Sequence, residues 1–244
     1  MEIDSDTVAM LREEPQRRPP SRLLLLLEGR AFAEYAQLRL SWRSLQQLPR
    51  GDGHPVLVIP GFATTDGSTR PLRRVLKQLG YDVHGWGQGR NYGMRGSIRE
   101  ALRMRIDTLY GEGRKISLVG WSLGGVYARE IARHDPSRVR RVITLGSPIN
   151  GHPQSNNVDR IYRWANRGRA QPVDWEGHQR RRVAPAVPCT AIYSKSDGIV
   201  DWRCSLEEIA PNTENVEVRG SHCGLGVNPQ VVRIIADRLA RPLS

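Results

Sequence analysis

The feature that most constrains the fold is an alternation of short apolar runs with stretches of helical periodicity. The apolar runs are typical of strands buried on both faces of a sheet. They read HPVLVIPGF (54–62), KISLVGWS (115–122), RVITLGSP (141–148) and CTAIYSKSD (189–197). Amphipathic helical patterns lie between or after them, as in SIREALRMRIDTLY (97–110) and NPQVVRIIADRLARP (228–242). This alternation predicts an α/β fold with a mostly parallel central sheet flanked by helices.

The first 50 residues do not follow this alternation. Residues 1–22 are polar, charged and proline-bearing, which indicates a mobile tail. Residues 23–48 are expected to form one amphipathic helix, because apolar side chains recur there at steps of three and four. Its apolar stripe comprises Leu24, Leu27, Ala31, Tyr35, Leu38, Trp42 and Leu45, and Arg30, Glu34, Arg39 and Arg43 lie off the stripe. The helix is expected to dock on the domain, and peripheral contact of residues 24–45 with an anionic membrane is the alternative.

Residues 54–244 are expected to form the α/β domain with one insertion. Between about residues 150 and 187, a polar segment that carries arginines and tryptophans interrupts the rhythm of strands and helices. A segment of this size predicts a small lid or cap over a site.

Composition and charge limit the class of partner. The formal net charge is +12, but nearly all of the 37 basic residues are arginines, and they are spread over the whole chain. We interpret this charge mainly as a compositional bias, and we expect no nucleic-acid partner. The arginine-rich runs at 138–141 and 180–182 leave binding to an anionic surface as an alternative. No His, Asp or Cys cluster has the spacing of a zinc site, so no metal or other cofactor is expected.

The sequence favours a cytoplasmic location, with peripheral membrane contact as the open alternative. The run Leu23–Leu27 is shorter than the apolar core of a signal peptide, which spans about 7–15 residues. Three cysteines fit a reducing compartment, with free thiols as the simpler expectation. A bridge between Cys204 and Cys223 is also conceivable.

The stretch GWSLGG (120–125) is the clearest sign of chemistry. A G-x-S-x-G pattern is a weak signal alone, but here it follows a buried strand and opens a helix. That context is typical of a nucleophile elbow, a tight turn that lifts a serine hydroxyl above the end of a sheet. Ser122 is therefore the expected nucleophile.

A serine nucleophile needs a base and an orienting carboxylate. Among six histidines, His222 is favoured because it lies in a loop between the last strand and the last helix. Asp197 directly follows a strand and is favoured as the acid over Asp201, which is interpreted as a cap or a surface charge. The expected catalytic set is Ser122, Asp197 and His222, in that chain order.

Two backbone N–H groups are expected to stabilise the oxyanion. Leu123, the residue after the nucleophile, supplies one of them. The other is expected from Phe62, since Gly61 lets the chain turn after the first strand. Trp121 flanks the nucleophile and is the expected substrate-binding residue.

These residues resemble the α/β-hydrolase superfamily, particularly its small bacterial lipase- and esterase-like members. The matching pieces are VLVIPGF, GRNYG, SLVGWSLGG, ITLGSPING, SKSDGIVDW and GSHCGLG, which span about residues 54–235. The resemblance implies an α/β-hydrolase fold and a serine nucleophile acting on acyl esters or related substrates. Two departures are that PGF replaces the His-Gly pair common in the first loop, and that residues 1–50 have no counterpart.

The sequence thus predicts a serine hydrolase that cleaves small-molecule or lipid carboxylic esters. An acyltransferase using the same acyl-enzyme is the first alternative, because an alcohol or thiol can replace water as acceptor. A catalytically silent binding or scaffold protein of this fold is the second. Tryptophans near the expected site, including Trp164, Trp175 and Trp202, favour an apolar or aromatic acyl group.

Overall fold

The computed structural model describes residues 19–94, 96–111, 113–150 and 182–242. Their centre is a six-stranded, fully parallel sheet in the order β2-β1-β3-β4-β5-β6. The strands are β1 (Pro55–Ile59), β2 (Asp82–Gly85), β3 (Ile116–Trp121), β4 (Val139–Leu145), β5 (Cys189–Tyr193) and β6 (Thr213–Glu217). The predicted α/β fold with a parallel sheet is therefore confirmed.

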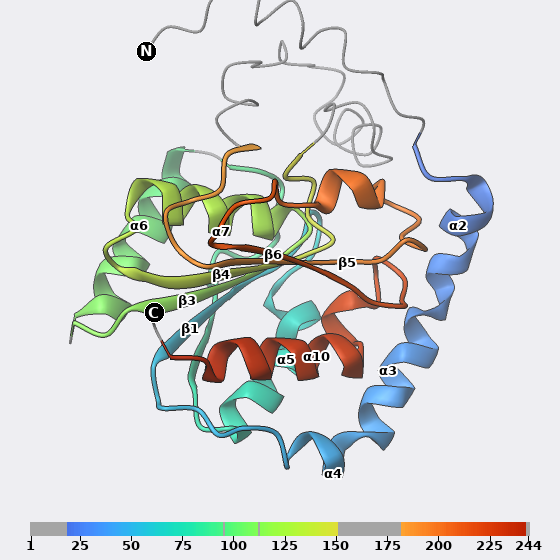
Figure 1. Ribbon diagram of the computed structural model, residues 1–244, viewed down its shortest axis with the longest axis horizontal. Coiled ribbons are helices and arrows are strands. Elements are labelled where there is room, and N and C mark those ends of the chain that lie inside the picture. Colours follow the sequence, from blue (N-terminus) through green and yellow to red (C-terminus); the bar gives the residue numbers. More distant parts are fainter. Residues whose placement is uncertain (1–18, 95, 112, 151–181, 243–244) are drawn as a thin grey trace, which may run out of the picture.

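Helices cover both faces of the sheet (Figure 1). One face packs against α5 (Asp66–Gln78) and α10 (Pro229–Ala240), and the other packs against α6 (Gly96–Tyr110) and α7 (Leu123–His134). Each side encloses its own apolar core, because β1 and β3 are buried along their whole length and alternate side chains enter opposite layers. Two short 3-10 turns, η2 (Trp202–Ser205) and η3 (Leu225–Val227), follow β5 and β6.

The strand order creates a switch point at the centre of the sheet. The chain goes from β1 to one side to form β2, and then returns to the other side of β1 to form β3. Loops that leave β1 and β3 therefore diverge at their carboxyl ends and leave a crevice, which is where open α/β sheets bind ligands. The loop after β1 and the turn at Ser122 both lie at this point.

The N-terminal segment, residues 22–45, forms four consecutive short helices instead of the single predicted helix. These are α2 (Arg22–Leu26), η1 (Leu27–Arg30), α3 (Ala31–Leu40) and α4 (Trp42–Leu45). The segment runs along one edge of the molecule, past the ends of β5 and β6 (Figure 1). Its C-terminal part packs on the domain, with Leu38 and Leu45 buried in the core.

The predicted apolar stripe of this segment is partly wrong. Glu28 and Glu34 are buried, whereas Leu27 and Tyr35 are more than 40% exposed. The reason is that both carboxylates accept hydrogen bonds from backbone N–H groups of loops at the sheet edge, so polar side chains occupy the inner face. None of the described helices has the length and hydropathy of a membrane span.

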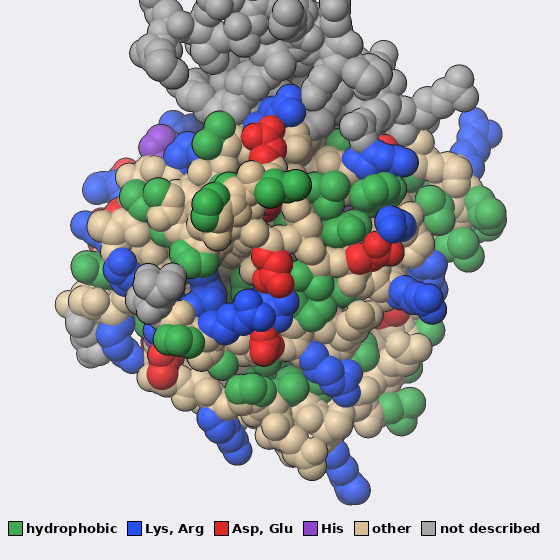
Figure 2. All heavy atoms as spheres, in the orientation of Figure 1, with side chains coloured by type: hydrophobic (Ala, Val, Ile, Leu, Met, Phe, Trp, Pro, Cys, Tyr) green, Lys and Arg blue, Asp and Glu red, His purple; other side chains and the backbone are tan. Residues whose placement is uncertain are grey.

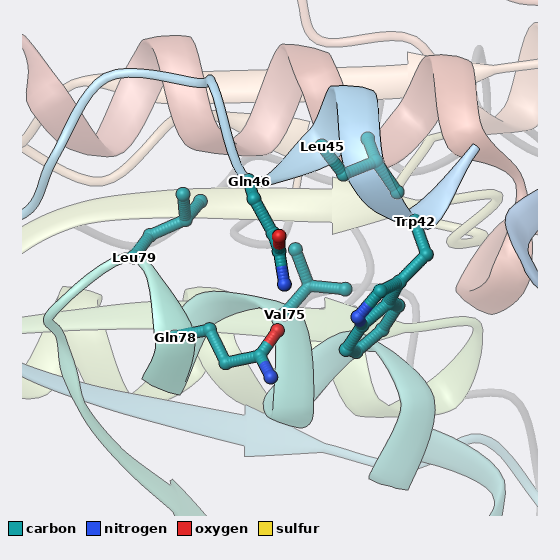
Figure 3. A pocket seen from close by; sticks show the side chains of 6 residues that line it. All are labelled: Trp42, Leu45, Gln46, Val75, Gln78 and Leu79. Carbon is teal, nitrogen blue, oxygen red and sulfur yellow. The ribbon is translucent and has the colours of Figure 1, made fainter.

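A seam joins α4 to the end of α5 (Figure 3). Trp42 and Leu45 face Val75 and Leu79 across a notch that has no room for a water molecule. The Arg74 guanidinium lies over the Trp42 ring, with its carbon 5.4 Å from the ring centroid. This packing of α4 against the end of α5 anchors the N-terminal segment.

The expected insertion at about 150–187 lies mostly outside the described residues, as do Trp164 and Trp175. The same is true of residues 1–18 of the expected tail.

Candidate active site

Ser122 lies on a strained turn between β3 and α7. Its backbone has φ 53° and ψ −122°, a conformation that non-glycine residues rarely adopt. Glycines make the turn possible: a Cβ on Gly120 would overlap the Gly125 backbone, and one on Gly124 would overlap the carbonyl oxygen of Ile59. The turn therefore has the geometry expected of a nucleophile elbow.

Gly124→Ala is expected to destabilise the protein by about 3 kcal/mol, because the new methyl meets backbone atoms that cannot rotate away. Besides the overlap with Ile59, it would lie 2.7 Å from the Pro60 carbonyl oxygen. Urea unfolding measures the effect. Gly29→Ala is the matched control, since nothing lies within 4 Å of a Cβ there, and equal stability losses in the two variants would contradict the prediction.

His222 and Asp197 form a buried pair. His222 Nδ1 lies 2.6 Å from Asp197 Oδ2. The other carboxylate oxygen of Asp197 accepts the N–H groups of Ile199 and Val200, both at 2.8 Å, so the carboxylate has a fixed orientation. Asp201 instead accepts the Arg203 N–H at 2.9 Å and caps η2, which agrees with its interpretation as a cap.

The surroundings of His222 favour its protonated form. Burial alone would lower the pKa of His222, but attraction to Asp197, the hydrogen bond between them and the nearby Glu28 carboxylate outweigh it. The pKa of His222 is therefore raised above its usual value.

Ser122 and His222 line the same cavity, whose volume is about 180 Å³. Phe62, Trp121 and Ile199 give it an apolar wall. The loop after β1 passes directly beside the serine, because a Cβ on Gly61 would lie 3.2 Å from Ser122 Cβ. The structure thus brings the serine, the histidine–aspartate pair and the loop after β1 to one crevice.

Leu123 and Phe62, the expected oxyanion donors, directly follow Ser122 and Gly61 in the chain. Leu123 is the first residue of α7, and the first N–H groups of a helix have no acceptor within that helix. Phe62 lines the cavity from the loop after β1.

The comparisons with known proteins identify the family of this fold. The family model of the alpha/beta hydrolase fold matches residues 41–187. The chain belongs to the α/β-hydrolase fold family. Membership assigns it to a superfamily of hydrolases, and the bond that it cleaves depends on its own site. No curated protein matches the sequence.

Solved structures show the same fold at low identity. A monoacylglycerol lipase from Paleococcus ferrophilus is similar with TM-score 0.57 and 16% identity, over 79% of this chain and 96% of that one. The naproxen esterase from Bacillus subtilis gives TM-score 0.57 and 14% identity, over 86% and 98%. The thioesterase domain from the curacin biosynthetic pathway gives TM-score 0.54 and 16% identity, over 80% and 93%.

Asn91 fixes the first loop of this α/β hydrolase, a role that the sequence analysis missed. Its side-chain amide donates to the Pro60 carbonyl at 2.8 Å, and its backbone exchanges hydrogen bonds with Ala63 and Thr64. Ala63 is held at φ 57° in the same loop. In the sequence, Asn91 is the centre of the piece GRNYG (89–93), which carries the family resemblance but does not by itself indicate this role.

Trp121 lines the cavity, and its indole N–H is bound within the protein. The indole N–H donates to the His222 carbonyl oxygen at 3.1 Å. Trp121 therefore supports the histidine loop in addition to its expected contact with substrate. The structure describes all three cysteines, and no disulfide joins Cys204 to Cys223, so the conceivable bridge is not formed.

A second Ser–His–Asp chain lies at the amino ends of the strands. His54 Nε2 is 2.8 Å from Ser117 Oγ, and its Nδ1 contacts Asp52. Ser117 is fully buried, so no substrate reaches it. Burial lowers the pKa of His54. Burial alone would raise the pKa of Asp52, but hydrogen bonds from His54 outweigh it and lower this pKa to about 2.

His54 should make the protein less stable in mild acid. The pKa of histidine in an unfolded chain is about 6.5. Below that pH, the unfolded chain binds a proton at His54 that the folded protein, with its lower pKa, does not bind. The free energy of unfolding therefore falls by up to about 1.4 kcal/mol per pH unit until the pH reaches the folded pKa. His54→Gln is expected to flatten the change between pH 7 and pH 5.5 in urea unfolding. The exposed His134 supplies the control, and a loss of pH dependence in His134→Gln instead would contradict the assignment.

Proposed function

We propose that this α/β hydrolase cleaves carboxylic esters through an acyl-enzyme on Ser122. The observation that carries the proposal is the strained Ser122 in one cavity with His222, whose Nδ1 is bound by the buried Asp197. A buried carboxylate that orients a histidine beside a serine is the arrangement that serine hydrolases use to make a hydroxyl nucleophilic.

The chemistry follows from this arrangement. His222 takes the Ser122 proton as the hydroxyl oxygen attacks the ester carbonyl, and Asp197 stabilises the imidazolium. The N–H groups of Leu123 and Phe62 hold the negative oxygen of the tetrahedral intermediate. His222 then gives its proton to the leaving alcohol, and water releases the acyl group by the same steps in reverse order.

The apolar wall of the cavity supports an apolar acyl group as substrate. A volume of about 180 Å³ favours a short chain over a long one within the described residues. We therefore expect faster turnover of a p-nitrophenyl butyrate than of a p-nitrophenyl palmitate. An alcohol acceptor added to the assay separates the alternatives, since acyl transfer yields a new ester and hydrolysis yields the free acid.

The test of the activated serine needs no knowledge of the substrate. The purified protein is treated with a fluorophosphonate, and the adduct is located by mass spectrometry. We expect labelling of Ser122 in the wild type and its loss in His222→Ala. A wild-type protein that stays unlabelled with and without detergent, and hydrolyses none of the esters, would favour a silent binding protein instead.

Contact of the N-terminal segment with anionic lipid is a second proposal. Leu26, Phe32 and Leu40 are each more than 75% exposed. Figure 2 shows hydrophobic side chains over α2 with basic side chains beside them, and Arg22, Arg39 and Arg43 are exposed on the same segment. Apolar side chains with arginines around them are complementary to an anionic bilayer surface.

Sedimentation with vesicles tests this contact. The protein is expected to bind vesicles of phosphatidylcholine with phosphatidylglycerol more strongly than phosphatidylcholine alone, and Phe32→Glu should weaken this binding. Ile209→Glu is the control, because Ile209 is also a highly exposed apolar residue and lies outside the segment. Equal binding of both variants would overturn the proposal.

A further inference from the structure

The loop that carries His222 is held by carboxylates of the N-terminal segment. The Ser221 N–H donates to Glu34 Oε1 at 2.8 Å. The next two N–H groups, of His222 and Cys223, donate to the two oxygens of Glu28 at 3.0 and 2.7 Å. Three successive backbone N–H groups around the expected base are thus bound by side chains that precede them by more than 180 residues.

The same Glu28 carboxylate also holds the loop that carries Asp197. The Gly198 N–H donates to Glu28 Oε1 at 2.8 Å. The following two N–H groups of that loop donate to Asp197 itself. One buried side chain therefore connects the acid loop after β5 with the base loop after β6.

Further contacts keep the segment close to both loops. Arg30 Nη2 donates to the carbonyl oxygens of Ser196, at 2.6 Å, and Gly220, at 3.0 Å. A Cβ on Gly198 would overlap the Leu24 carbonyl oxygen, and one on Gly224 would overlap the Glu34 carboxylate. Glycine at these two positions allows the close approach.

We propose that Glu28 is a positioning residue that fixes His222 and Asp197 relative to each other, with Arg30 and Glu34 in support. The inference rests on the proposed roles of His222 and Asp197. Hydrogen bonds from backbone N–H groups to a carboxylate are short and strong. They matter here because a displacement of about 1 Å in a catalytic group costs about 100-fold in rate.

Glu28 also acts on the charge of His222. The charged groups that face the imidazole are Asp197, from the loop after β5, and Glu28, from η1, while the Trp121 ring is neutral. Burial lowers the pKa of His222, and both carboxylates raise it. Loss of the Glu28 charge should therefore move the pKa of His222 downward, an effect that loss of packing alone would not produce.

The first experiment measures the rate of fluorophosphonate labelling of Ser122 against pH in the full chain. Glu28→Gln is expected to lower the plateau rate by about 10- to 100-fold. It should also move the acid limb, the part of the profile in which the rate falls with falling pH, to lower pH. Glu207→Gln is the matched control, because Glu207 is also a buried carboxylate and pairs with Arg129 instead. A wild-type rate and acid limb in Glu28→Gln would overturn the proposal.

Amide hydrogen exchange provides a readout that does not depend on chemistry at Ser122. Peptides covering 196–201 and 219–226 are expected to exchange at least about tenfold faster in Glu28→Gln than in the wild type. Unchanged protection of both peptides would overturn the proposal. A wild type that is neither labelled, with or without detergent, nor active on the esters would overturn the proposed function, and exchange would still decide whether Glu28 holds the loops.

Arg30→Met is the second variant if Glu28→Gln does not fold. It retains the aliphatic stem and both carboxylates, but it removes the hydrogen bonds to Ser196 and Gly220. Labelling should slow by about threefold or more, and both peptides should exchange faster. Wild-type labelling and protection in Arg30→Met would contradict the role of the segment.

Discussion

Ser122→Ala is expected to lower kcat for a short-chain ester by about 10³- to 10⁶-fold. The variant retains the cavity, the His222–Asp197 pair and the backbone N–H groups, but it has no oxygen to form the acyl-enzyme. Stopped assays with a p-nitrophenyl ester measure the loss, and mass spectrometry checks for the fluorophosphonate adduct. Ester turnover within tenfold of wild type would show that another residue carries the reaction.

Ser122→Gly separates the chemistry from the strain of the turn. Both substitutions remove the hydroxyl, but glycine adopts φ 53° without a steric penalty. Ser122→Gly should therefore be inactive and more stable than Ser122→Ala by about 1 kcal/mol. The comparison is made by urea unfolding, and equal stability of the two variants would argue against a strained turn.

Asp197→Asn is expected to cost about 10⁴-fold in kcat/KM. The asparagine amide fits the same space, but it no longer holds His222 in the tautomer that accepts the Ser122 proton, and it no longer stabilises the imidazolium. Asp201→Asn is the matched control, because Asp201 caps η2 and lies four residues further along the chain. Similar losses of activity in the two variants would overturn the assignment of the acid.

The same variant changes the pH profile in a defined direction. His222 accepts a proton only when it is neutral, and its pKa lies above the ordinary value of 6.5. Wild-type kcat/KM should therefore fall as the pH drops through a value above 6.5. In Asp197→Asn the favourable charge is lost, while His222 stays buried. The pKa of His222 should therefore fall, and the acid limb should move to lower pH. An acid limb that stays in place would contradict the pairing.

The sequence was sufficient to predict the parallel sheet and the neighbourhood of Ser122, Asp197 and His222. Each of these residues follows a strand, and the carboxyl ends of parallel strands meet at one edge of a sheet. The order of short apolar runs therefore brings residues together that are far apart in the chain. The glycines around Ser122 predict the tight turn from the sequence alone.

The roles of Glu28 and Glu34 could not be predicted in the same way. Helical periodicity assigns a charged side chain to the solvent face, and Glu34 was accordingly expected off the buried stripe. Its position inside depends on N–H groups of loops that come much later in the chain. The pairing of His54 with Ser117 was missed for a similar reason, because it depends on the register of β1 beside β3.

The wide sequence separation of the Glu28 contacts has a consequence for folding. Hydrogen bonds that join residues 170–195 positions apart close a very large loop, so they form only after most of the chain is ordered. During refolding from denaturant, far-UV circular dichroism should therefore recover earlier than reactivity at Ser122. The rate at which the serine regains its reactivity would then report the last step of folding.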